Sequence, residues 1–195
     1  MSSRGGYSQA SAAISSQRIA RGLGDLGIAC DEAHIDALHR YMGELALWNR
    51  KRDLVKAEGE ELVVRHLLDS LAGLETVRGE LDGRAKETLF DLGSGGGFPG
   101  VPLAVFLPDI VVKLVERSAR KCAFLRGVAA VVGLPNLEVV QAEYTAVENA
   151  TADVVVFRAL APVNAELAGH LSSIVKPAGS VVAYKGRYDN AAVEA

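Results

Sequence analysis

The chain has 195 residues, of which 49% are hydrophobic, so it can form one ordinary domain with a smaller appendage and a proper core. Its formal net charge of -3 excludes a bulk polycation that coats nucleic acid, so any RNA contact must come from a local basic patch. Cys30 and Cys122 form no C-x-x-C pair, and no run of about 18 apolar residues occurs. We therefore expect neither a disulfide framework nor a metal site, in a cytoplasmic chain that spans no membrane.

The first part of the chain is predicted to be helical. Residues 1–13 are small and polar and predict a disordered tail, followed by a helical subdomain over residues 14–85. Apolar residues recur at helical spacing over residues 14–26 and 35–48, with Asp31 as the N-cap of the second helix. The same spacing over residues 62–71 predicts a third helix.

After residue 85 the pattern alternates between strands and helices. Strands are predicted at 88–91, 110–116, 137–141, 153–157 and 180–184, and helices at 99–106, 118–132 and 163–175. Gly133 and Pro135 are the stop signals of the middle helix. Alternating elements of this kind predict an α/β fold: a doubly wound, mostly parallel, Rossmann-like sheet over residues 86–195, with its site at the carboxyl ends of the strands.

The glycine-rich segment 91–100 is predicted to bind a nucleotide-like cofactor between the first strand and its helix. Residues 95–100 also fit the dinucleotide pattern G-x-G-x-x-G, which alone is weak evidence. A pyrophosphate needs free N–H groups at the helix start, and Pro99 and Pro102 remove two of them. Asp91 would repel a pyrophosphate but attract the ammonium and sulfonium groups of S-adenosylmethionine. The segment therefore favours a methyl donor, with its methionine part against Asp91 and residues 93–97.

Two further positions are candidates for the nucleoside part of the cofactor. Glu116 ends the second strand, 23 positions after Gly93, where doubly wound folds place an acid on ribose hydroxyls. The alternative is a solvated acid at a helix start, beside Arg117. Adenine is expected near residues 141–145, although these residues could equally form an ordinary turn.

Cationic side chains end two later strands above the same site. Arg158 follows a buried strand and suits the cofactor carboxylate, a phosphate or the O6 edge of a guanine. Its structural alternative is a salt bridge, with Asp91 as one candidate partner. Lys185 ends the last strand and either faces the same cleft or is a surface lysine before a turn.

The residues around Arg158 narrow the reaction type. Methyltransferases that act on amino groups place Asn or Asp before Pro-Pro-Tyr or Pro-Pro-Phe after the fourth strand. The sequence at this position is Phe157-Arg158-Ala159-Leu160-Ala161-Pro162, which argues against an exocyclic amine as the target. Carbon methylation of pyrimidines needs a cysteine in the cleft, and neither cysteine is placed there. Guanine N7 carries a nucleophilic lone pair and no proton, so positioning alone can supply catalysis. A site with cations and no obvious base suits N7.

The helical subdomain carries a basic triplet, Arg50-Lys51-Arg52, directly after Trp48 and Asn49. The triplet could grip phosphates, and Trp48 could stack on a base. The structural alternatives are a solvated turn for the triplet, a core anchor for Trp48 and a helix C-cap for Asn49. His66 could likewise be a hydrogen-bonded helix residue.

Three segments together resemble the RsmG family, also called glucose-inhibited division protein B. They are Leu47-Trp48-Asn49 with Val64-Arg65-His66-Leu67-Leu68-Asp69-Ser70, the loop from Asp91 to Leu103, and Arg158-Ala159 with Tyr184-Lys185-Gly186. The resemblance covers about residues 30 to 187. It implies a class I methyltransferase fold that uses S-adenosylmethionine to methylate N7 of guanine 527 (conventional rRNA numbering) in 16S ribosomal RNA of the small subunit.

The resemblance also implies roles for individual residues, with Arg158 as the catalytic residue that bridges cofactor and target. The cofactor-binding residues expected are Asp91, Gly93, Ser94, Gly95, Gly97, Phe98, Glu116, Glu143, Tyr144, Thr145 and Arg158. The RNA-binding residues expected are Trp48, Asn49, Arg50, Lys51, Arg52, Arg65, His66 and Lys185. We expect a monomer whose partner is 16S ribosomal RNA or the small subunit.

The chain departs from the family pattern at three places. It has Glu143-Tyr144-Thr145 where the family usually has Arg-x-Glu, and Asp53-Leu54-Val55 where the family has Asn-Leu-Thr. It also stops at Ala195, where the family continues with a helix and a closing strand pair. We therefore expect that the sheet lacks its last strands and that the strand at 180–184 has an unprotected edge, which predicts reduced stability or pairing with another copy.

Two other functions fit parts of this pattern. A small-molecule methyltransferase would share the glycine loop but lack a basic cleft around residues 50–52 and Arg158. A nucleotide-binding regulatory module would bind S-adenosylmethionine without methylating any RNA.

Overall fold

A computed structural model describes residues 15–52, 54–57, 59–81, 87–160, 162 and 164–185, with the side chains of Lys51 and Arg52 excepted. The tail expected over residues 1–13 lies outside the described residues, as do residues 186–195. No helix in the described part of the chain is long and apolar enough to cross a membrane.

The helices of the first part begin with α1 (Ser16–Asp25) and α2 (Glu32–Arg52). Ser15 caps α1, because its side chain accepts a hydrogen bond from the Arg18 N–H at 3.1 Å. Helix α2 continues through residues 50–52, so the basic triplet lies on the last turn of a helix rather than in a turn after it, and Arg50 is exposed.

The third predicted helix is divided into short pieces. It consists of α3 (Gly59–Leu62), the π-helix η1 (Val63–Leu68), α4 (Asp69–Ala72) and, after Gly73, α5 (Leu74–Gly79). Apolar spacing does not separate a π-turn from an α-turn over so few residues, so the sequence predicted one regular helix. Single π-turns often occur at functional sites.

The second part is a parallel sheet of five strands in the order β3-β2-β1-β4-β5, which confirms the predicted fold. In chain order its elements are β1 (Thr88–Leu92), α6 (Gly100–Phe106), β2 (Val111–Val115), α7 (Ala119–Val132), β3 (Leu137–Val140), the 3-10 turn η2 (Tyr144–Ala146), β4 (Ala152–Arg158), α8 (Ala165–Ile174) and β5 (Val175–Tyr184).

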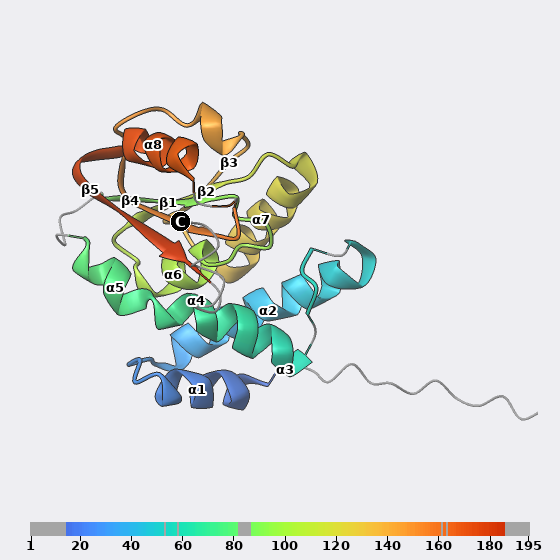
Figure 1. The fold of residues 1–195 in the computed structure, drawn as a ribbon. Coiled ribbons are helices and arrows are strands. Elements are labelled where there is room, and N and C mark those ends of the chain that lie inside the picture. The colour runs from blue at the N-terminus through green and yellow to red at the C-terminus, as the bar shows by residue number, and fades with distance from the viewer. Residues whose placement is uncertain are drawn as a thin grey trace, which may run out of the picture.

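The two faces of the sheet carry different cores. Leu89, Val112 and Val154 point to the face that packs on α6, α7 and the helices of the first part, in one continuous apolar cluster. Phe90 and Val155, their neighbours along the strands, point to the other face, which is covered by α8. Figure 1 shows this layering, with α8 on one side of the sheet and α1 to α4 on the other. The helical subdomain is thus part of the main core.

Strand β5 is longer than predicted, because it begins at Val175 directly after α8 rather than at residue 180. Its start is irregular: the register shifts between Ala152 and Val154 of β4, and Ala178 has a φ of 68°. Among the described residues β5 pairs with β4 alone and forms an edge of the sheet. Tyr184 ties this edge to the helices, because its hydroxyl donates to the Ser70 carbonyl at 2.9 Å.

Candidate active site

The glycine loop turns tightly across the carboxyl end of β1. Gly93, Gly95 and Gly97 have φ values of 72°, 57° and 97°, a region that favours glycine. The N–H of Gly93 donates to the Val115 carbonyl at 2.9 Å, which ties the loop to the end of β2. A Cβ atom added at Gly93 would lie 2.6 Å from Cδ1 of Leu160, so the loop also has little room for side chains.

Asp91 lies under this loop with its side chain fully buried. Its Oδ2 accepts a hydrogen bond from the N–H of Gly100 at 3.0 Å, at the start of α6. Its Oδ1 is buried and has no hydrogen-bond partner among the described residues. Burial raises the pKa of Asp91 to about 7, although the Gly100 N–H, the nearby Ser94 hydroxyl and the Arg158 guanidinium oppose this rise. The Ser94 hydroxyl itself donates to the Asp91 backbone carbonyl at 2.8 Å. A buried acceptor without a partner is rare in folded proteins and calls for a donor, which a bound ligand or an ordered water can supply.

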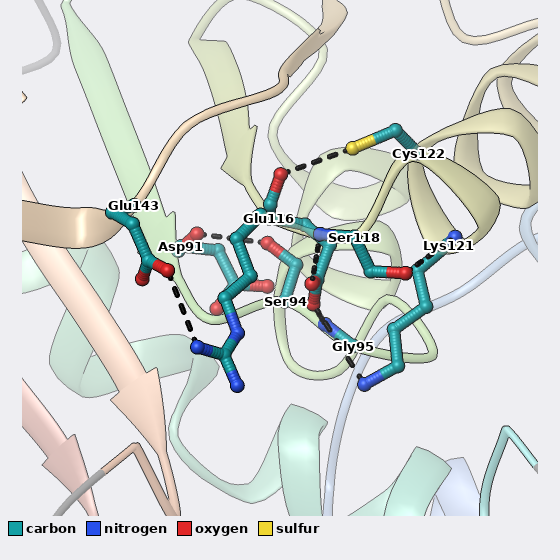
Figure 2. Close-up of polar contacts among 9 residues, drawn as sticks. Asp91, Ser94, Gly95, Glu116, Ser118, Lys121, Cys122 and Glu143 are labelled. Atoms are coloured by element: carbon teal, nitrogen blue, oxygen red, sulfur yellow. Dashed lines mark hydrogen bonds and ion pairs between the residues drawn. The ribbon is translucent and has the colours of Figure 1, made fainter. Parts of the chain in front are cut away.

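Glu116 lies at the end of β2 and is 6% exposed, so the solvated alternative is wrong. Figure 2 shows its carboxylate between the glycine loop and the start of α7. One oxygen accepts from the Gly95 N–H at 3.0 Å, and the other accepts from the Ser118 N–H at 2.8 Å. The Lys121 amine lies 3.9 Å away. Each carboxylate oxygen keeps a further lone pair for a ligand hydroxyl.

The expected adenine loop after β3 borders a cavity. Glu143 forms an exposed ion pair with Arg117 at 3.2 Å, and the Tyr144 carbonyl lies 2.9 Å from Nε2 of His170. A cavity of about 250 Å³ opens between η2 and α8, and it is lined by Tyr144, Thr145, Pro162, Asn164, Glu166, Leu167 and His170. Sequence reasoning did not single out His170, because its helical spacing carries no sign of the loop that it meets.

Arg158 ends β4 and crosses to the helical subdomain. Its Nη1 lies 3.3 Å from the Arg65 carbonyl and 3.3 Å from Oδ2 of Asp69, and its Nη2 lies 2.7 Å from Nδ1 of His66. The guanidinium carbon also lies 5.2 Å from the centre of the Phe98 ring. Arg158 therefore forms the salt bridge of its structural alternative, but the partner is Asp69 and not the suggested Asp91.

Phe98 connects the glycine loop to the helical subdomain. Its ring centre lies 5.3 Å from that of Tyr41 in α2 and 5.3 Å from that of His66 in η1. The Tyr41 hydroxyl donates to the Gly96 carbonyl at 2.7 Å, and burial raises its pKa well above the usual value. Tyr41 was predicted only as a core residue, since nothing in its spacing pointed to the loop 55 positions later.

Two of the expected RNA-binding side chains make contacts inside the protein. Trp48 is half-buried, with its ring 5.4 Å from that of Phe124 in α7. The Asn49 amide donates to the carbonyls of Val55 and Ala57 at 2.8 and 3.3 Å and accepts from the Val55 N–H at 3.0 Å. These contacts favour the core alternative for Trp48. The C-cap alternative for Asn49 is wrong, because α2 continues to Arg52 and Asn49 instead holds the backbone of residues 55 and 57.

The other expected RNA-binding residues divide into three groups. Arg50, Arg65 and Lys185 are exposed, and Arg65 forms an ion pair with Glu61 at 2.5 Å. The side chains of Lys51 and Arg52 lie outside the described part of the structure. His66 is half-buried and faces Arg158 and Phe98. Residues from η1, the glycine loop and β4 thus meet at one place.

Comparison with known proteins finds the same family that the sequence motifs resemble. The family model described as rRNA small subunit methyltransferase G (GidB) matches residues 34–195. The chain is 37% identical over 173 residues to the ribosomal RNA small subunit methyltransferase G of Neisseria gonorrhoeae (strain NCCP11945), covering 88% of this chain and 80% of the relative. It is 35% identical over 174 residues to the enzyme of that name from Bordetella avium (strain 197N), covering 88% and 76%.

Solved structures share the fold at lower identity. A crystal structure of coclaurine N-methyltransferase bound to N-methylheliamine and SAH matches with a TM-score of 0.52 at 17% identity, over 86% of this chain and 56% of that one. A putative S-adenosyl-L-methionine-dependent methyltransferase from Methanococcus maripaludis matches with a TM-score of 0.51 at 17% identity, over 73% and 62%. These likenesses concern the fold alone.

Proposed function

The chain belongs to the rRNA small subunit methyltransferase G family, and we propose that it transfers the methyl group of S-adenosylmethionine to N7 of guanine 527 (conventional rRNA numbering) in 16S ribosomal RNA. The observation that carries the proposal is the Oδ1 of Asp91, which has no partner among the described residues and is buried beside the glycine loop at the same sheet edge as Glu116 and Arg158. Such an edge is where open α/β sheets bind their ligands.

The methionine part of the cofactor is assigned to Asp91 and the glycine loop. An ammonium group would supply the donor that Oδ1 of Asp91 lacks, and its charge would favour the ionised carboxylate. The left-handed turns at Gly93, Gly95 and Gly97 let a ligand approach the backbone closely. The buried acceptor thus fits S-adenosylmethionine, whereas a pyrophosphate would place negative charge against a buried carboxylate.

The nucleoside part is assigned to Glu116 and the cavity beside η2. Backbone N–H groups hold both oxygens of Glu116, so the carboxylate is already oriented before a ribose binds. Tyr144 and Thr145 line the cavity near the expected adenine position, which supports their assignment to the cofactor. Glu143 pairs with Arg117 and would border this position.

Methyl transfer to N7 requires little acid–base catalysis from the protein. The cofactor supplies a methyl carbon on a sulfonium, whose sulfur keeps the electron pair of the broken bond. The N7 lone pair forms the new bond without losing a proton, so no residue must act as a base. Nδ1 of His66 is engaged by Arg158, and Oδ2 of Asp91 by Gly100, in agreement with a site that works by positioning. Arg158 would orient the guanine through O6 or an adjacent phosphate.

RNA binding is assigned to the exposed cations of the helical subdomain and the end of β5. Arg50 and Arg65 would contact phosphates together with Lys51, Arg52 and Lys185. Because such contacts release counterions, RNA affinity should fall steeply with salt. A monomeric, cytoplasmic enzyme remains part of this proposal.

The test is a methylation assay with labelled S-adenosylmethionine. Small subunits or 16S RNA that lack the modification serve as substrate, and subunits that already carry it serve as the matched control. The expected result is label in the unmodified RNA alone, mapped as N7-methylguanine at one position. Label in protein or small molecules but not in RNA would contradict the proposal. Label at another base would contradict the assigned position but leave RNA methylation supported.

A further inference from the structure

We propose that His66 is a positioning residue, which holds the Arg158 guanidinium at the cofactor edge by accepting its hydrogen bond on Nδ1, rather than a residue that grips RNA. The proposal rests on the proposed function for its kinetic consequences, but its geometry stands independently. Arg158 is the expected catalytic residue, and its orientation is fixed from the helical subdomain.

The contacts of Arg158 come from one stretch of helix. The Arg65 carbonyl, the His66 imidazole and the Asp69 carboxylate all lie within hydrogen-bond range of the guanidinium. The first two belong to the π-helix η1 and the third begins α4. Hydrogen bonds of a π-helix skip one residue further than in an α-helix, which changes the direction of the carbonyls and side chains on that turn. The irregular turn therefore has an identified partner, the end of β4.

The hydrogen bond fixes the protonation state of His66. A guanidinium has five N–H donors and no acceptor, so the 2.7 Å contact requires an unprotonated Nδ1. The imidazole proton of the neutral ring must then lie on Nε2. The charges that face His66 are Arg158 from β4, Asp69 from α4, Arg65 from its own turn and Glu61 from α3. Burial and the Arg158 charge lower the pKa of His66 to about 4, in agreement with a neutral ring.

Phe98 supports the same orientation from the glycine loop. The guanidinium carbon lies 5.2 Å and the His66 ring centre 5.3 Å from the centre of the Phe98 ring. Arg158 is thus held by an aromatic face of the loop and by acceptors on the helix. Its side chain is 18% exposed, whereas that of Arg65 is 71% exposed. The exposed cation suits a phosphate contact, and the enclosed one suits the reacting groups.

The kinetic test distinguishes the effect of the hydrogen-bond acceptor on His66 from the effect of its aromatic ring. His66→Phe keeps an aromatic ring against Phe98 and removes the acceptor, whereas His66→Asn places a carbonyl oxygen near the Nδ1 position. Loss of a hydrogen bond to a charged group predicts that His66→Phe lowers kcat on unmodified small subunits about 10- to 100-fold, with a smaller change in KM. His66→Asn should restore most of kcat. Val64→Thr, on an exposed residue of the same turn, is the control and should leave kcat unchanged.

A double variant decides whether His66 acts through Arg158. If it does, His66→Phe combined with Arg158→Ala should be no slower than Arg158→Ala alone. Multiplying effects, or an increase in KM for RNA with unchanged kcat for His66→Phe, would overturn the proposal and favour a direct RNA contact. Thermal unfolding of each variant identifies any that fail to fold; if His66→Phe is one of them, the NMR measurement below, which needs no variant of His66, carries the test.

Nitrogen-15 NMR of the full chain tests the hydrogen bond without any turnover. At pH 7 we expect His66 with an unprotonated Nδ1 and a protonated Nε2, and a changed Nδ1 signal in Arg158→Ala. A protonated Nδ1, or a signal that Arg158→Ala does not move, would overturn the proposal whether or not RNA is methylated. Absence of RNA methylation together with the expected signals would instead overturn the proposed function and leave the positioning contact supported.

Discussion

The buried carboxylate of Asp91 predicts a pH-dependent cost in stability when no cofactor is bound. Its folded-state pKa of about 7 lies above the ordinary value of 3.8, so the folded chain holds a proton that the unfolded chain releases between these pH values. The neutral acid is therefore favoured in the fold. The contribution of Asp91 to the free energy of unfolding is therefore present at low pH and is lost as the pH rises through about 7.

The size of the effect follows from the pKa values. One pKa unit corresponds to about 1.4 kcal/mol, so raising the pH from 5 to 8 should lower the unfolding free energy through Asp91 by about 3 kcal/mol. Asp91→Asn removes this dependence, because the amide does not titrate, and its oxygen can still accept from Gly100. The unpartnered amide N–H₂ adds a cost of about 1 to 3 kcal/mol that does not vary with pH.

Urea unfolding of the cofactor-free wild type and of Asp91→Asn at pH 5, 6, 7 and 8 measures this difference. The unfolding free energy of the variant relative to wild type should rise by about 3 kcal/mol across the series. Asp109→Asn, which alters an exposed carboxylate, is the control and should show no such trend. A difference that stays constant from pH 5 to 8 would refute the argument from burial. Asp91→Asn should also bind S-adenosylmethionine about 10- to 100-fold more weakly, because the ammonium group of the cofactor loses a charged acceptor.

Three further predictions concern neighbouring residues. Glu116→Gln should raise the Kd for S-adenosylmethionine by about 10- to 100-fold in calorimetry, since it weakens the charged bonds to ribose; an unchanged Kd would remove Glu116 from the cofactor site. Asn49→Ala should lower the unfolding free energy by about 1 to 3 kcal/mol, because two carbonyls and an N–H lose their hydrogen-bond partner. RNA affinity at fixed salt should change little. A large loss of RNA affinity at unchanged stability would instead support an RNA contact by Asn49. The pKa of His66 is depressed from 6.5 to about 4, so its contribution to stability is present above pH 6.5 and is lost as the pH falls toward 4; His66→Phe should flatten that part of the pH–stability curve.

The alternation of apolar runs and turn residues was enough to predict the sheet and its flanking helices. β1 differs from the prediction by one residue at its end and β2 by one residue at each end, because glycine, proline and apolar spacing are local signals. The π-turn at 63–68 and the early start of β5 at Val175 were not predicted. Both depend on distant partners: the first faces Arg158, and the second pairs with Ala152 across a register shift.

The sequence by itself determined which chemical groups stand at the ends of the strands: a carboxylate before the glycines, an acid after the second strand and an arginine after the fourth. Strand direction and the parallel order then place them at one edge. Only the tertiary structure decided what each group contacts. It buried Asp91 with one oxygen that has no partner in the described part of the chain, turned Trp48 and Asn49 inward, and joined Arg158 to His66 and Asp69 rather than to Asp91. The Arg158 pairings join residues 89 and 92 positions apart, which local spacing does not encode.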